Sequence, residues 1–204
     1  MPADASAGAG SSAAPTLVID VPAWVDAVTR SGQAYVGDEE KMALVIRLAR
    51  DNVERGTGGP FGAAVFEVGS GRVVAAGVNS VTRLHNCVLH AEIMAIMLAQ
   101  QRVGSFTLRA PDRPAYELVT SSEPCAMCLG ATLYSGVSRL VMGAAREDAM
   151  AIGFDEGPVF AESHAYLAGR GIVVVRDVRR AEAVSVLRKY REGGGPIYTG
   201  DVTP

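Results

Sequence analysis

The chain has 204 residues, of which 49% are hydrophobic and 20% charged, a composition that suits one globular domain with a full-sized core. Its formal net charge of −3 and sequence pI of about 5.6 argue against a polynucleotide substrate, because binding to a phosphate backbone relies on a basic surface. No apolar run approaches the roughly 18 residues of a membrane span. We therefore expect a small-molecule substrate, no nucleic-acid partner and no membrane association.

The N-terminal part of the chain contains a low-complexity segment followed by a more apolar one. Residues 1–15 are almost all Ala, Gly, Ser and Pro, so we predict a disordered leader without the pattern of a signal peptide. Residues 16–36 are too apolar for a free linker and should pack on the domain or on a partner subunit. A helix is expected from Asp38, where acidic residues favour the first turn and apolar residues recur at helical spacing up to Val53.

The next elements begin with two strands, 61–68 and 72–79, joined by a Gly-Ser-Gly turn. The remaining predicted elements are helix 89–101, strand 116–121, helix 124–135, strand 138–143, helix 158–168, strand 171–175 and helix 179–192. This order predicts a three-layer α/β/α sandwich with a mixed five-stranded sheet. Residues 16–192 would form this single domain, and residues 193–204 a C-terminal tail.

Two short motifs point to a metal centre, His90-Ala91-Glu92 and Pro124-Cys125-Ala126-Met127-Cys128. Zinc takes about four ligands in a tetrahedron, and the motifs offer three good ones, His90, Cys125 and Cys128. A three-ligand set leaves one position for water, which is typical of a catalytic zinc and not of a structural one. Glu92 is then placed to transfer the protons of that water. The sequence predicts one Zn²⁺ per chain.

A structural zinc is the alternative interpretation of the same motifs, with His85 or Cys87 as a fourth ligand. Cys87 lies three residues before His90, but a free cysteine is commonly an ordinary buried thiol, which is what we expect here. Three cysteines with one Cys-x-x-Cys pair do not suit the disulfide framework of a secreted domain. The expected location is therefore the cytoplasm.

His-x-Glu followed by Pro-Cys-x-x-Cys is the known signature of zinc-dependent nucleobase deaminases, and the chain resembles the cytidine deaminase-like superfamily. It is most similar to the guanine deaminase group, with matching segments at 58–63, 78–81, 122–131 and 151–156. This resemblance implies attack of hydroxide on an amino-bearing aromatic carbon. Glu92 would take the proton and pass it to the ring nitrogen and the departing amine, so that ammonia is released.

The resemblance also implies substrate contacts. Asn79 stands where the group has its base-binding Asn, and its amide suits the edge of a purine-like ring. Phe61 would contact the flat base, with core packing as the alternative. Glu156 would be a second catalytic acid that accepts hydrogen bonds from the base and relays protons, with a solvated loop acid as the alternative. Ala91 is a further substrate-binding candidate, and so is Tyr134, for which core packing is the alternative.

Guanine, converted to xanthine and ammonia, is the expected substrate. The chain departs from the group before the metal-binding histidine, where Leu89 replaces the usual Ala and is expected to reshape the pocket floor. Cytosine, a nucleoside or an aminotriazine remains an alternative, followed by tRNA adenosine and lastly by a non-catalytic zinc-stabilised module. In the group the C-terminal tail closes over the active site, and Tyr198 is the candidate cap. Superfamily members are usually dimers, so we expect a homodimer through helices around 124–135 and 147–168.

Overall fold

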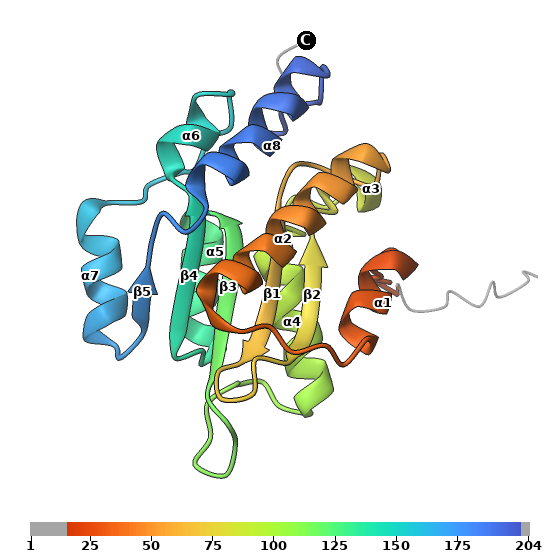
Figure 1. The fold of residues 1–204 in the computed structure, drawn as a ribbon. Coiled ribbons are helices and arrows are strands. Elements are labelled where there is room, and N and C mark those ends of the chain that lie inside the picture. The colour runs from red at the N-terminus through yellow and green to blue at the C-terminus, as the bar shows by residue number, and fades with distance from the viewer. Residues whose placement is uncertain (1–15, 201–204) are drawn as a thin grey trace, which may run out of the picture.

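The computed structural model of the protein describes residues 16–200, so the predicted leader 1–15 and the last four residues of the tail lie outside it. Its centre is one mixed sheet with the strand order β2-β1-β3-β4-β5 (Figure 1). The strands are β1 (Gly62–Glu67), β2 (Val73–Val78), β3 (Tyr116–Ser122), β4 (Arg139–Ala144) and β5 (Val173–Val175). β1 pairs antiparallel with β2 and β3, whereas the β3–β4 and β4–β5 pairs are parallel.

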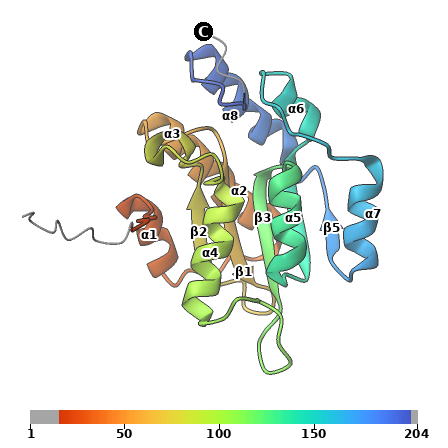
Figure 2. The same ribbon diagram turned by 180° about the vertical axis from the view of Figure 1, so that it is seen from behind.

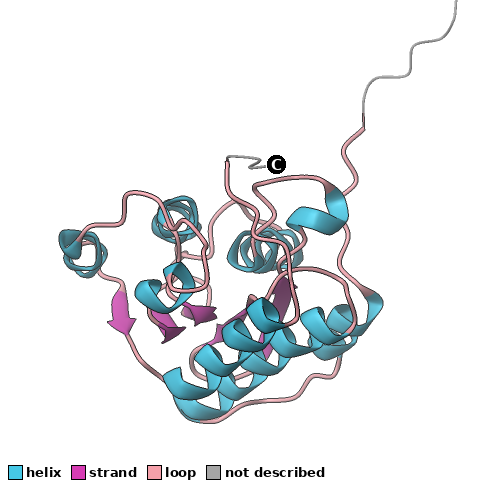
Figure 3. Ribbon diagram, turned by 90° about the horizontal axis from the view of Figure 1, so that it is seen from above, coloured by secondary structure: helices cyan, strands magenta, loops and turns pink. Residues whose placement is uncertain are grey.

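Helices cover both faces of this sheet, which confirms the predicted α/β/α sandwich (Figures 2 and 3). One face carries α2 (Gly37–Glu54) and α8 (Arg180–Glu192), and the other carries α4 (Ala91–Val103) and α5 (Ala126–Ser135). α7 (Ala161–Gly169) lies beside β5 on the α5 side. Within residues 16–200, no helix combines the length and the hydropathy needed to span a bilayer.

Two glycines in β1 and β2 allow helices on both faces to approach the sheet closely. A Cβ atom on Gly77 of β2 would lie 2.4 Å from the carbonyl oxygen of Ala91, and one on Gly62 of β1 would lie 2.5 Å from that of Val45 in α2. Both distances are far below van der Waals contact, so only glycine allows these approaches. The start of α4, where the His-Ala-Glu motif lies, is therefore pressed directly onto β2.

Three short helices were absent from the sequence prediction: α1 (Ala23–Arg30), α3 (Val81–Leu84) and α6 (Arg146–Met150). α1 packs on the edge strand β2 of its own domain, because Val25 is fully buried and Oγ1 of Thr29 accepts the N–H of Ala76 over 3.1 Å. α3 and α6 are too short to show a helical period. The expected helix 124–135 begins only at Ala126, so Pro124 lies before the helix instead of in its first turn.

A buried ionic network links α2 to the centre of the sheet. The side chain of Glu117 in β3 is completely buried, and its Oε1 lies 2.5 Å from Nζ of Lys41. Its other oxygen contacts Arg139 of β4, whose guanidinium also lies 3.0 Å from the carboxylate of Asp38. Each buried charge in the network has a partner of opposite charge. Removal of one side chain would leave its partner as an uncompensated buried charge, which is strongly destabilising.

Candidate active site

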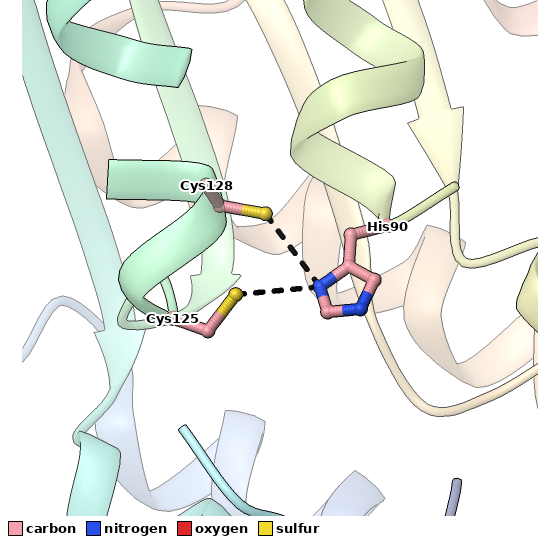
Figure 4. A group of neighbouring side chains, drawn as sticks. All are labelled: His90, Cys125 and Cys128. Carbon is pink, nitrogen blue, oxygen red and sulfur yellow. Dashed lines mark hydrogen bonds between the residues drawn. The ribbon is translucent and has the colours of Figure 1, made fainter. Parts of the chain in front are cut away.

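The predicted metal ligands meet at one point between α4 and α5. Nδ1 of His90 lies 3.5 Å from Sγ of Cys125 and 3.6 Å from Sγ of Cys128, and both thiols point at the imidazole (Figure 4). Zn–S bonds of 2.3 Å and Zn–N bonds of 2.0–2.1 Å at tetrahedral angles place sulfur and nitrogen about 3.6 Å apart. The observed spacing therefore fits zinc without any rearrangement of the three side chains.

No further ligand joins these three among residues 16–200, because His90, Cys125 and Cys128 alone form a compact group of metal-binding side chains. The alternative of a structural zinc closed by His85 or Cys87 is thus unsupported in the described part of the chain. The expectation of a buried Cys87 is wrong, since this thiol is exposed. The donor set is the three-ligand type that leaves a coordination position for water.

The ends of two helices supply the electrostatic setting. His90 is the N-cap of α4 and Cys125 that of α5, so both helix dipoles direct their positive ends at the site. The hydrogen bond with Cys128, followed by that with His90, lowers the pKa of Cys125 to about 4, against the effect of burial. The bond with Cys125 and burial raise the pKa of Cys128. Without metal one thiolate and one thiol thus share a proton, and a divalent cation would favour the thiolate form of both.

Two buried carboxyl groups lie beside the ligands. Glu92, in the first turn of α4, is 6% exposed, and Glu156, in the loop between α6 and α7, is 8% exposed. Burial, followed by the negative charge of Cys125, raises the pKa of Glu92 to about 7 and that of Glu156 to about 8. Both groups therefore exchange protons near neutral pH, which is the property required of general acids and bases.

These groups border a narrow cavity of about 30 Å³, enough for one or two water molecules. Its walls are formed by Phe61, Asn79, His90, Glu92, Glu123, Cys125, Phe154, Asp155, Glu156 and Tyr198. An outer groove of about 410 Å³ adjoins it and shares His90, Cys125 and Glu156 as lining residues, with the exposed Cys87 also on its wall.

The C-terminal tail closes the cavity from one side through Tyr198. A Cβ atom on Gly59 would lie 1.9 Å from the phenol oxygen of Tyr198, so glycine is required where the ring crosses the loop before β1. The ring of Phe154 lies 5.0 Å from those of both Tyr198 and Phe61, in edge-to-face geometry. The cavity thus has an aromatic wall to which the tail contributes one ring.

Asn79 presents a hydrogen-bond donor to the cavity. Nδ2 of the buried Asn52 donates to the carbonyl oxygens of Gly59 and Asn79, each over 2.9 Å, and so fixes the backbone at this position. Oδ1 of Asn79 accepts the N–H of Val81, whereas its Nδ2 is buried without a hydrogen-bond partner among the described residues. Oη of Tyr198 is likewise buried without a partner in good hydrogen-bond geometry. Burial raises the pKa of Tyr198 well above its usual value, against the effect of the nearby Asn79 amide, so the phenol stays protonated.

The structure gathers most of the predicted site residues but not all of them. Phe61, Asn79 and Glu156 line the same cavity as His90, Cys125 and Glu92. Ala91 is fully buried against β2 behind that cavity and is not among its lining residues. Tyr134 is 81% exposed and lies on a different surface groove, so its assignment to the pocket is wrong within this chain.

Leu89 and two further positions also differ from the sequence expectation. Leu89 is buried in the core and does not line the cavity, so it does not form the pocket floor. Phe154 and Glu123 do line it, although neither was a candidate. Both lie inside segments that resemble the guanine deaminase group, and Glu123 adjoins Pro124, so motif position was the available signal.

Comparison with known proteins agrees with this geometry. Residues 36–144 match the family described as "Cytidine and deoxycytidylate deaminase zinc-binding region". The guanine deaminase of Bacillus subtilis (strain 168) is 37% identical over 124 residues, which cover 61% of this chain and 75% of that protein. A solved guanine deaminase from Nitrosomonas europaea superposes with a TM-score of 0.84 and 41% identity, covering 87% of this chain and 97% of that one. NE0047 in complex with 2,6-diaminopurine gives 0.86 and 42%, covering 90% and 97%.

Proposed function

The chain belongs to the cytidine and deoxycytidylate deaminase family of zinc-binding proteins, and on that premise we propose that it hydrolyses guanine to xanthine and ammonia. The observation that carries the proposal is a narrow cavity beside the three zinc-type ligands, which two buried carboxyl groups and the amide of Asn79 also line. The likeness to two guanine deaminases favours guanine over cytosine, nucleosides and tRNA adenosine.

His90, Cys125 and Cys128 would hold one Zn²⁺ per chain. When bound, zinc lowers the pKa of a coordinated water from 15.7 to about 7 and so supplies a nucleophile at neutral pH. Glu92 would accept the proton of that water, because its buried carboxyl group lines the cavity beside His90 and Cys125. It would then deliver the proton to the ring nitrogen next to the attacked carbon, which makes that carbon more electrophilic. The amino group would leave as ammonia once it is protonated and the new hydroxyl group has given up its proton.

Residues on the other walls would bind and orient the base. The rings of Phe61 and Phe154 lie against the cavity and offer apolar surfaces for a flat heterocycle. Nδ2 of Asn79 donates to an acceptor on the purine edge. Glu156 accepts a hydrogen bond from an N–H of guanine. Its pKa of about 8 in the metal-free protein keeps Glu156 protonated near neutrality. It would transfer this proton to the departing amine and regain one as the new hydroxyl group becomes the carbonyl of xanthine.

A substrate panel tests this proposal directly. Zinc-loaded protein is incubated with guanine, adenine, cytosine, guanosine and an aminotriazine, and ammonia release is followed for each. We expect the highest kcat/KM with guanine, and xanthine as the product. A higher value for cytosine or guanosine would reassign the substrate, and no release from any compound would remove the enzymatic proposal altogether.

We also propose a homodimer formed through the surface of α5 and α7. This surface exposes large aromatic side chains, with Tyr134 81%, Phe160 65% and Tyr166 59% exposed, and such patches are characteristic of protein interfaces. Sedimentation analysis should give twice the mass of the chain, and Tyr166→Glu should shift it toward the monomer.

The three free cysteines favour the cytoplasm as the location.

A further inference from the structure

Glu123 is a buried acidic residue between the metal motif and the cavity, and the chemistry proposed above gives it no task. It follows β3 and immediately precedes Pro124, it is 6% exposed, and its side chain lines the cavity. A carboxylate in such surroundings persists only with compensating donors, because burial of an unpaired charge is strongly unfavourable.

Three groups from later segments of the chain lie close to this carboxylate, and two of them donate hydrogen bonds to it. Nη2 of Arg176, after β5, lies 3.1 Å from its Oε2, and the backbone N–H of Arg146, at the start of α6, lies 3.4 Å from the same oxygen. Nε2 of His164 in α7 lies 3.3 Å from Oε1, without hydrogen-bond geometry. The carboxylate thus joins the end of β3 to three segments that follow β4.

Two of these groups lie on either side of segment 151–160 in the sequence. This segment connects α6 to α7 and carries Glu156. Arg146 precedes this segment, and its Nη1 donates to the carbonyl oxygen of Val159 over 2.9 Å. His164 lies in the first turns of α7, directly after the segment. The residues that contact Glu123 therefore hold both ends of the loop whose middle faces the cavity.

A second connection joins the same two regions, since the N–H of Ala126 at the start of α5 donates to the carbonyl oxygen of Glu156 over 3.0 Å. We propose that Glu123 is a positioning residue for Glu156. Through its contacts with Arg146, His164 and Arg176, it fixes segment 151–160 relative to α5. The inference rests on the proposed function only for the role of Glu156. Its physical content is the placement of one carboxyl group by another.

A double-mutant cycle tests this coupling in the zinc-loaded enzyme. Glu123→Gln keeps the side-chain volume and removes the charge, and Arg176→Met removes one of its donors. Each should lower kcat for guanine roughly 10- to 100-fold, because catalysis is sensitive to misplacement of a group by about 1 Å. In a Glu156→Gln background the same changes should cost less than about twofold, since residues that act through one another are not additive.

Arg180→Met is the matched control, because Arg180 is 44% exposed and paired with Asp148, much as Arg176 is 48% exposed and paired with Glu123. Backbone hydrogen exchange of segment 151–160 gives a readout that does not depend on activity. It should accelerate at least about tenfold in Glu123→Gln and stay unchanged in Arg180→Met, with equal zinc content in both.

Unchanged exchange in Glu123→Gln, or an undiminished kcat penalty in the Glu156→Gln background, would overturn the positioning role. A wild-type protein that releases no ammonia from guanine would instead contradict the proposed function. In that case the exchange measurement alone decides whether Glu123 holds the segment.

Discussion

Replacement of Glu92 by Gln tests whether this residue transfers protons or only lies near the metal. Gln has the same shape but neither takes up nor releases a proton. Glu92 is 6% exposed, and burial, with the charge of Cys125, raises its pKa to about 7. General acid–base catalysis by such a group contributes about 10²–10⁴-fold, which corresponds to roughly 2.7–5.5 kcal/mol of activation free energy. The structure therefore predicts a loss of kcat in this range.

The assay combines ammonia release from guanine with zinc analysis of the same sample. Glu92→Gln should retain one zinc per chain, because Glu92 is not a ligand of the proposed site, while kcat falls at least about 100-fold. Glu67→Gln serves as the control, since Glu67 lies at the end of β1 and pairs with the exposed Arg72. If the zinc-loaded Glu92→Gln protein keeps more than about a tenth of the wild-type kcat, another group transfers the proton and the reasoning fails.

Three further changes have definite expected outcomes. Deletion from Gly193 onward should lower kcat/KM for guanine about tenfold or more without loss of zinc, because the cavity loses Tyr198, and an unchanged rate would refute the cap. In metal-free protein Glu156 has a folded pKa of about 8 against 4.5 for the free group, so the free energy of unfolding should fall as pH rises through this window, by up to about 1.4 kcal/mol per unit. Calorimetry should show a shallower fall in Glu156→Gln, and a Tm that rises with pH would contradict the shift. Lys41→Met should cost about 3–5 kcal/mol in urea unfolding, because the fully buried Glu117 keeps only Arg139 as a partner, and a cost below about 1 kcal/mol would show that the network is relaxed.

The metal centre was predictable from the sequence because its geometry is local. Cys125 and Cys128 lie one turn apart at the start of a helix, and His90 precedes another helix, so each motif nearly defines its own conformation. The sheet was predictable for a similar reason, since alternating strands and helices leave few topologies. Only the convergence of the N-termini of α4 and α5 depends on the tertiary fold. The ligand chemistry of the two motifs had already implied this convergence, because one zinc needs donors from both.

The residues that line the rest of the cavity were harder to predict, because side-chain direction and long-range contacts are not encoded in motif spacing. Tyr134 follows Cys128 by six residues, which is about 240° around an α-helix, so the two side chains leave α5 on different faces. Helical periodicity alone could have excluded it. The exposure of Cys87 could not be foreseen, since the general tendency of free thiols toward burial says nothing about one particular loop.

The lining of the cavity comes from two parts of the chain. The zinc ligands, Glu92 and Asn79 all lie within residues 36–144, the segment that matches the deaminase family. Phe154, Glu156 and Tyr198 come from the chain after it and close the cavity to about 30 Å³. Ligand pockets usually measure about 300 Å³ or more, and the adjoining groove of about 410 Å³ extends the cavity to that size. Substitutions of Phe154 or Tyr198 should therefore change kcat/KM for guanine while zinc binding stays intact, because neither is a metal ligand.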